Sequence, residues 1–175
     1  MYEIRIHSRG GQGGVTAARL LAMAALHDGN YATACPFYGA ERRGAPVVSF
    51  VRIDDRPIRI YSQIRSPDMI IVLDASVMQT VDVLNGLKTG GRILINSARK
   101  QEFSAYVTNT VDLTGIALRE NLVVSGSPIL NTPVIGALAK TGIVSADAAK
   151  SAIRGMFADE RNIRAAEAAY AEVSV

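Results

Sequence analysis

The sequence is poor in cysteine and aromatic residues, and it contains no tryptophan. The single cysteine, Cys35, excludes an internal disulfide and a cluster ligated by this chain alone, since an iron–sulfur cluster takes about four thiolates. Aromatic residues make up 6% of the chain, too few for a nucleic-acid platform of stacked side chains beside basic ones. The net charge of +3 is also too small to indicate a nucleic-acid partner.

Long apolar runs are missing as well. None approaches the roughly 18 residues of a membrane helix, and charged residues interrupt the first apolar segment, so no signal peptide is recognisable. We therefore expect no membrane association and a cytoplasmic location. A length of 175 residues suits one domain, 1–175. The abundance of alanine, valine and isoleucine suits a buried parallel sheet between helices.

The hydrophobic pattern predicts an α/β fold, a three-layer, Rossmann-like, mostly parallel sheet with an antiparallel hairpin. The predicted strands are 2–7, 31–37, 47–53, 58–61, 69–73 and 92–96, with weaker candidates at 106–107 and 110–111. The predicted helices are 15–27, 76–87, 113–119, 134–140, 146–157 and 160–173. The hairpin joins 47–53 to 58–61 through a turn. The last helix is either marginal or docks on another subunit.

A glycine-rich stretch, Arg9-Gly10-Gly11-Gln12-Gly13-Gly14-Val15-Thr16, separates the first predicted strand from the first predicted helix. Such a turn leaves backbone N–H groups and the positive end of a helix dipole available to an anion, usually a phosphate. A turn that only allows close packing needs one or two glycines, whereas this one has four. The stretch therefore predicts an anion-binding nest.

Two common nucleotide sites do not match this loop. In the dinucleotide fingerprint G-x-G-x-x-G, Thr16 stands in place of the third glycine, and no carboxylate ends the second predicted strand. A Walker-type loop requires a lysine after its glycines, and the loop has none. Dinucleotide binding and nucleoside triphosphate hydrolysis are therefore disfavoured.

A second loop, 38–46, contains Glu41, Arg42 and Arg43. In a doubly wound sheet it and the glycine loop would lie at the carboxyl ends of neighbouring parallel strands, where ligands bind. The planar fork of arginine suits a phosphate. Taken alone, a solvated loop in which Glu41 pairs with Arg42 explains this stretch equally well.

Together, the two loops resemble the gamma subunit, or gamma domain, of the 2-oxoacid:ferredoxin oxidoreductases. The matching stretches are Arg9 to Gly13, Val15-Thr16-Ala17, Phe37-Tyr38-Gly39, Glu41 to Pro46, Arg52 to Asp55, Pro57-Ile58-Arg59, Pro67-Asp68, Asn131-Thr132-Pro133, Gly136-Ala137 and Thr141-Gly142-Ile143. They follow one another in order over about the whole chain.

The resemblance implies an enzyme that oxidatively decarboxylates a 2-oxoacid to acyl-CoA and passes electrons to ferredoxin or another acceptor. Thiamine diphosphate, magnesium and iron–sulfur clusters would belong to partner chains, namely alpha, beta and ferredoxin-like delta subunits. The gamma subunit would help to form the coenzyme A site and bridge its partners. No catalytic residue and no metal ligand is assigned to this chain, and the resemblance does not indicate which 2-oxoacid is used.

Within this family interpretation, seven residues are candidates for holding the phosphates of coenzyme A. The cradle comprises Gly10, Gly11, Gln12, Gly13 and Thr16, and the charge clamps are Arg42 and Arg43. The alternative hypothesis is a free-standing, Rossmann-like nucleotide-binding or sensory module that uses the same anion nest.

Three further polar residues have competing interpretations. His7, beside the glycine loop, is better explained as a hydrogen-bonded structural histidine than as a proton relay. Asp74 follows strand 69–73, where it is either a catalytic acid or the cap of a helix from Ser76. Asn131 is interpreted as a helix cap, or as a residue that faces a partner subunit.

Overall fold

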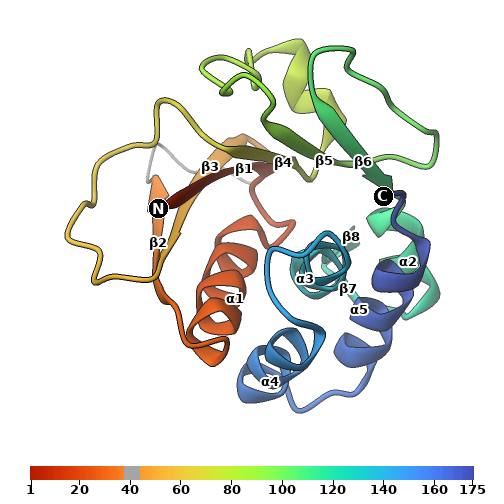
Figure 1. Ribbon diagram of the computed structural model, residues 1–175. Coiled ribbons are helices and arrows are strands. Elements are labelled where there is room, and N and C mark those ends of the chain that lie inside the picture. Colours follow the sequence, from red (N-terminus) through yellow and green to blue (C-terminus); the bar gives the residue numbers. More distant parts are fainter. Residues whose placement is uncertain (38–43) are drawn as a thin grey trace.

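The computed structural model describes residues 1–37 and 44–175. Its centre is a six-stranded sheet in the order β2-β3-β1-β4-β5-β6, with the helices packed against one face (Figure 1). The strands are β1 (Tyr2–Arg9), β2 (Tyr31–Phe37), β3 (Pro46–Asp54), β4 (Met69–Val72), β5 (Arg92–Asn96) and β6 (Val107–Val111). The helices are α1 (Gly14–His27), α2 (Leu113–Arg119), α3 (Asn131–Lys140), α4 (Ala146–Met156) and α5 (Arg161–Glu172). A small separate hairpin joins β7 (Val123–Val124) to β8 (Ser127–Pro128).

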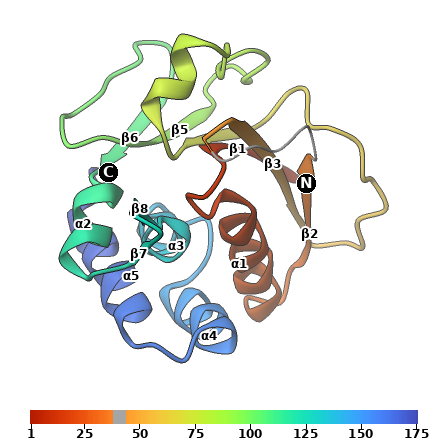
Figure 2. The same ribbon diagram turned by 180° about the vertical axis from the view of Figure 1, so that it is seen from behind.

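The sheet is mixed. β1, β4, β5 and β6 are parallel to one another, and β3 is antiparallel to both β1 and β2. The predicted α/β fold with a mostly parallel sheet and an antiparallel pair is therefore confirmed. The helix-free face is covered over β4 and β5 by the 3₁₀ helix η1 (Ala75–Gln79) and the loops around it (Figures 1 and 2).

The predicted hairpin is wrong in its second strand. Residues 58–61 form no strand, and the partner of β3 along the hairpin is β2 instead. Ala32 and Ala34 of β2 pack against the core on the helix side. Ile60 and Tyr61, in contrast, are 47% and 70% exposed. β2 thus buries apolar surface that the 58–61 segment does not, and burial decides the pairing.

Side chains of alternate residues along β1 enter different environments. Ile4 and Ile6 are buried in the main core, together with Leu20 and Leu21 of α1. Odd-numbered residues of β1 point to the opposite face, because side chains alternate along a strand. The central strand β4 is buried on both faces, as its continuous apolar run predicts.

The predicted helix 76–87 is also wrong, because only the short η1 forms there. Arg5, which lies in β1, donates from its Nη2 to the carbonyls of Val83 and Asn85, at 2.8 and 2.6 Å. Gly86 then takes a left-handed φ of +78°, with the Arg65 carbonyl where a Cβ would be. These long-range contacts hold the segment as turns, and the apolar spacing alone does not reveal them.

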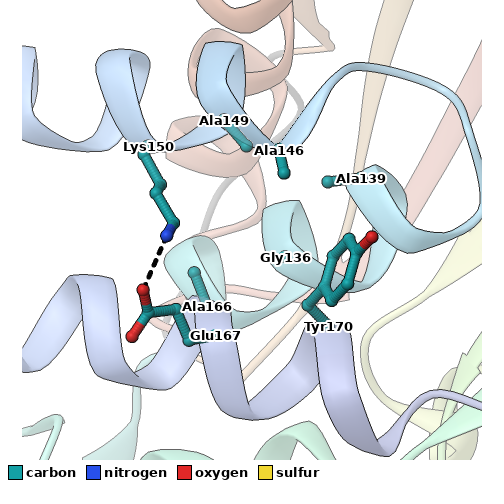
Figure 3. Close-up of a pocket in the computed structure, with 8 residues that line it drawn as sticks. All are labelled: Gly136, Ala139, Ala146, Ala149, Lys150, Ala166, Glu167 and Tyr170. Atoms are coloured by element: carbon teal, nitrogen blue, oxygen red, sulfur yellow. Dashed lines mark ion pairs between the residues drawn. The ribbon is translucent and has the colours of Figure 1, made fainter.

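The last helix packs within the chain rather than standing free. α5 lies against α3, where Gly136 allows the closest approach: a Cβ added there would lie 2.5 Å from the carbonyl carbon of Ala166. Small side chains also form most of the groove between α3, α4 and α5, in which Lys150 pairs with Glu167 at 2.7 Å (Figure 3). Lys150 and Glu167 carry opposite charges and neutralise each other, so neither is left unpaired in the groove.

Beyond α5 the chain returns to the sheet beside β6. Ser174 donates its backbone N–H to the Thr110 carbonyl at 3.0 Å, and its Oγ accepts from the Thr110 N–H at 2.8 Å. Asn109 Nδ2 donates to the Ser174 carbonyl at 2.7 Å.

Within residues 1–37 and 44–175, no helix is long and apolar enough to cross a bilayer.

Candidate functional site

The glycine loop connects the end of β1 to the start of α1. Gly11 and Gly13 have left-handed φ angles of 97° and 88°, which non-glycine residues rarely adopt. Gly14 begins the helix against the strand, because a Cβ there would lie 2.8 Å from the Ser8 Cβ. The glycines therefore set both the turn and the close approach of helix to strand.

The N-terminus of α1 has no side-chain cap. Its N-cap residue is Gly13, which has no side chain to accept from the first turn. The N–H groups of Gly14, Val15 and Thr16 belong to that first turn, so they have no acceptor within the helix. These three residues and Arg9 line a cavity of about 420 Å³. The cavity thus lies at the uncapped N-terminus of α1, the positive end of the helix dipole.

Four of the predicted cradle residues line this cavity, and the fifth faces elsewhere. Gly10, Gly11, Gly13 and Thr16 are among the lining residues. Gln12 lines an adjacent cavity of about 370 Å³ at the carboxyl ends of β4 and β5.

The Gln12 side chain braces the loop. Its Oε1 accepts from the Arg9 N–H and its Nε2 donates to Asp74 Oδ2, both at 2.8 Å. Its carbonyl accepts from the Leu130 N–H at 3.0 Å. In the described structure Gln12 therefore fixes the shape of the cradle through its own hydrogen bonds.

Asp74 anchors the other side of the loop. Burial disfavours its ionised form, but hydrogen bonds from Ser76 and Gln12, with the Arg9 charge, outweigh burial and lower the pKa of Asp74. Its Oδ1 accepts from the Ser76 N–H at 2.9 Å, which confirms the predicted cap, here of η1. Arg9 Nε donates to Ser76 Oγ at 2.8 Å and lies 3.7 Å from Asp74 Oδ2.

The arginine-containing loop ends on the glycine loop. Gly10 donates its N–H to the Ala45 carbonyl at 2.9 Å, and Gly44 donates to the Gly10 carbonyl at 3.1 Å. Arg9 Nη1 also donates to the Gly44 carbonyl at 2.8 Å. Arg42 and Arg43 themselves lie outside the described residues. The segment that immediately follows them is thus fixed to the cradle.

The route by which the two loops meet differs from the prediction. β1 and β2 are not neighbours, because the antiparallel β3 lies between them. The two strands point in the same direction, so their carboxyl ends still lie at one edge of the sheet. The prediction of a shared edge was sound, whereas the prediction of adjacent parallel strands was wrong.

Asn131 belongs to this cavity, although the sequence pattern indicated a helix cap. The N-cap of α3 is Leu130, and Asn131 is the first residue of the helix. Asn131 is 5% exposed, and its Oδ1 has no hydrogen-bond partner among the described residues. A Cβ on Gly13 would lie 3.0 Å from the Asn131 Cβ. The absence of a side chain on Gly13 therefore brings α3 and the loop together, a contact that no local pattern reveals.

His7 lies on the opposite face of the sheet. It is 3% exposed, and its Nε2 accepts from Arg5 Nε at 3.0 Å. Burial, reinforced by the Arg5 charge, lowers the pKa of His7 to about 4. A neutral, hydrogen-bonded ring agrees with the structural interpretation and places His7 away from the cradle.

Comparison with known proteins gives the family. Residues 3–172 match the family described as pyruvate ferredoxin/flavodoxin oxidoreductase. The chain is 50% identical to pyruvate synthase subunit PorC of Methanocaldococcus jannaschii, over 99% of this chain and 97% of that protein. It is 49% identical to the pyruvate/ketoisovalerate oxidoreductases common subunit gamma of Thermococcus kodakarensis, over 97% of this chain and 96% of that protein.

Solved structures agree. The pyruvate oxidoreductase subunit PORC of Thermotoga maritima has a TM-score of 0.82 at 36% identity, with coverage of 99% of this chain and 97% of that one. A further match is the 2-oxoglutarate:ferredoxin oxidoreductase of Magnetococcus marinus, solved with 2-oxoglutarate, coenzyme A and succinyl-CoA. Its TM-score is 0.79 at 15% identity, and the match covers 97% of this chain and 30% of that chain. The latter likeness shows the shared fold alone.

The α/β fold, the glycine loop and these matches define the chain as a subunit of a 2-oxoacid oxidoreductase. It belongs to the pyruvate ferredoxin/flavodoxin oxidoreductase family, as a gamma-type subunit. The predicted family resemblance is confirmed, and the family match favours a subunit over a free-standing nucleotide or sensory module.

Proposed function

We propose that this gamma subunit forms part of the coenzyme A site of a thiamine diphosphate- and iron–sulfur-dependent 2-oxoacid:acceptor oxidoreductase. The observation that supports the proposal is the uncapped N-terminus of α1, whose first-turn residues line the cavity of about 420 Å³ beside Arg9. Such a terminus suits an anionic phosphate. Coenzyme A offers a pyrophosphate and a ribose phosphate to it.

The role of the chain would be to bind and orient rather than to react. First-turn N–H groups would bond phosphate oxygens directly, and the Gln12–Asp74 hydrogen bond would keep the loop in shape. Arg42 and Arg43 are proposed to add positive charge, since Gly44 ties the end of their loop to Gly10. The acyl acceptor would thus be held for chemistry carried out on other chains.

The other cofactors are proposed to reside in partner subunits. A cluster does not fit this chain, because Cys35 is its only thiol. Within the described residues, no three His, Cys, Asp or Glu side chains gather as metal ligands. We therefore assign thiamine diphosphate, magnesium and the clusters to alpha, beta and ferredoxin-like delta subunits. A cytoplasmic complex that reduces ferredoxin or a similar acceptor is the corresponding setting.

Substitution of the two arginines tests the coenzyme A role. In the intact complex, Arg42→Ala and Arg43→Ala should each raise the Kd for coenzyme A about tenfold, since a charged hydrogen bond contributes roughly 1.5–3 kcal/mol. Isothermal titration would measure the change. The matched control is Arg56→Ala, which removes the same charge from the exposed turn after β3, at the opposite edge of the sheet. Wild-type affinity in both arginine variants would refute the proposed role.

The partner assignment has its own test. Protein purified from its native source under anaerobic conditions should elute as a complex with larger subunits that contain iron, sulfide and thiamine diphosphate. Gel filtration with metal and cofactor analysis would show this. Elution of the chain alone, with neither cofactor in its fractions, would contradict the assignment and favour a free-standing module.

A further inference from the structure

The cavity at the glycine loop continues into a second one. A cavity of about 190 Å³ adjoins it and extends toward Asn121 and Asn162. The two cavities share four lining residues, Val124, Ile129, Asn131 and Phe157. The site is therefore an elongated groove with a phosphate-binding end, a middle section and a far end near the start of α5.

The middle section combines apolar surface with one polar group. Val124 lies in β7, Ile129 directly follows β8, and Phe157 follows α4. Asn131 lines the same section; it is more than nine-tenths buried, and its acceptor oxygen Oδ1 lacks a partner among the described residues. Buried polar groups are normally hydrogen-bonded, so this oxygen indicates an absent donor. A phosphate or sulfate cannot provide that donor, since both only accept when fully ionised.

We infer that the groove takes an anionic ligand whose phosphate lies on the glycine loop and whose amide-containing arm runs over Asn131 toward the β7–β8 hairpin. This inference rests on the proposed coenzyme A role and adds the direction of the ligand. A ligand N–H donates to Asn131 Oδ1, and methylene groups pack on Val124, Ile129 and Phe157. The pantetheine arm of coenzyme A has both features, two amides separated by methylenes.

The test compares two ligands on the intact complex. 3′-Phosphoadenosine 5′-diphosphate has the phosphates of coenzyme A but no amide arm. Asn131→Leu should raise the Kd for coenzyme A about tenfold, as expected when a buried hydrogen bond is lost. The same variant should leave the Kd for the nucleotide unchanged. Arg42→Ala should raise the Kd for both ligands.

A second variant avoids the packing against Gly13. Val124 is 62% exposed, so Val124→Asp leaves the fold undisturbed while placing a carboxylate on the path of the arm. It should raise the Kd for coenzyme A at least about threefold and leave the Kd for the nucleotide unchanged, because a charge beside an apolar arm is costly. Its matched control is Val107→Asp, an exposed valine in β6 away from the groove.

The outcomes separate the inference from the function on which it rests. If Asn131→Leu and Val124→Asp leave both affinities unchanged while Arg42→Ala weakens both, the arm takes another path and the inference is wrong. Equal weakening of both ligands by Asn131→Leu would place Asn131 at the phosphates and would also overturn it. If the arginine variants leave both affinities unchanged, the proposed function fails.

Discussion

Gly136→Ala should destabilise the protein by at least about 3 kcal/mol, because overpacking against rigid backbone cannot be relieved by a rotamer change. The added methyl would overlap the Ala166 carbonyl and lie 2.7 Å from the Ala166 Cα. Helices α3 and α5 would have to separate, which would open the core on both sides of the contact. Urea denaturation followed by circular dichroism would measure the loss.

A second helical glycine provides the control for this effect. A Cβ on Gly155 of α4 would meet only the end of the Met23 side chain, at 3.7 Å. Gly155→Ala should therefore leave stability unchanged or raise it by up to about 1 kcal/mol, as alanine is the better helix former. If the two variants had equal stabilities, close packing would not be the reason for glycine at 136.

Lowering the pH from 7 to 4 should remove about 3 kcal/mol of stability through His7 alone. The folded-state pKa of His7 is about 4, against 6.5 for an unperturbed histidine. Between these values the unfolded chain binds a proton that the folded chain does not, so acid favours unfolding. The pKa is low because the ring is buried and lies beside the Arg5 guanidinium. Well above pH 6.5 the effect vanishes, because His7 is then neutral in both the folded and the unfolded chain.

The His7 contribution is isolated by comparing variants, since carboxylates titrate in the same range. His7→Gln should lose about 3 kcal/mol less than the wild type between pH 7 and pH 4, as measured by urea unfolding at each pH. His27→Gln replaces the only other histidine, which is exposed, and should keep the wild-type loss. Parallel pH profiles for wild type and His7→Gln would exclude the proposed linkage.

Elements whose start, end and hydrophobic pattern are all set by neighbouring residues could be predicted from the sequence. The bounds of β5 and α2 agree with the predicted 92–96 and 113–119. Each segment is a short apolar run or an amphipathic turn with a clear start and end. The segments that failed are held by distant residues. Arg5 binds the carbonyls of Val83 and Asn85, which replaces the predicted helix by turns.

The candidate site divides in the same way. The glycine loop could be predicted because backbone conformation selects glycine at Gly11 and Gly13. The orientation of Gln12 could not, since its partner Asp74 is 62 residues further along the chain. Nor could the burial of Asn131 beside Gly13, which depends on how α3 packs against the loop. Residue type indicated the chemistry of the loop, and tertiary packing decided which side chains reach it.

The bonds between Ser174 and β6 have a consequence for assembly. β6 is the last strand of the sheet, and unpaired backbone groups on such a strand can recruit a strand from another molecule. The chain's own final residues bond the outer side of β6 at Thr110 and Asn109. A neighbouring subunit that continued the sheet at this point would have to displace them. The chain itself therefore blocks strand addition at this point of β6.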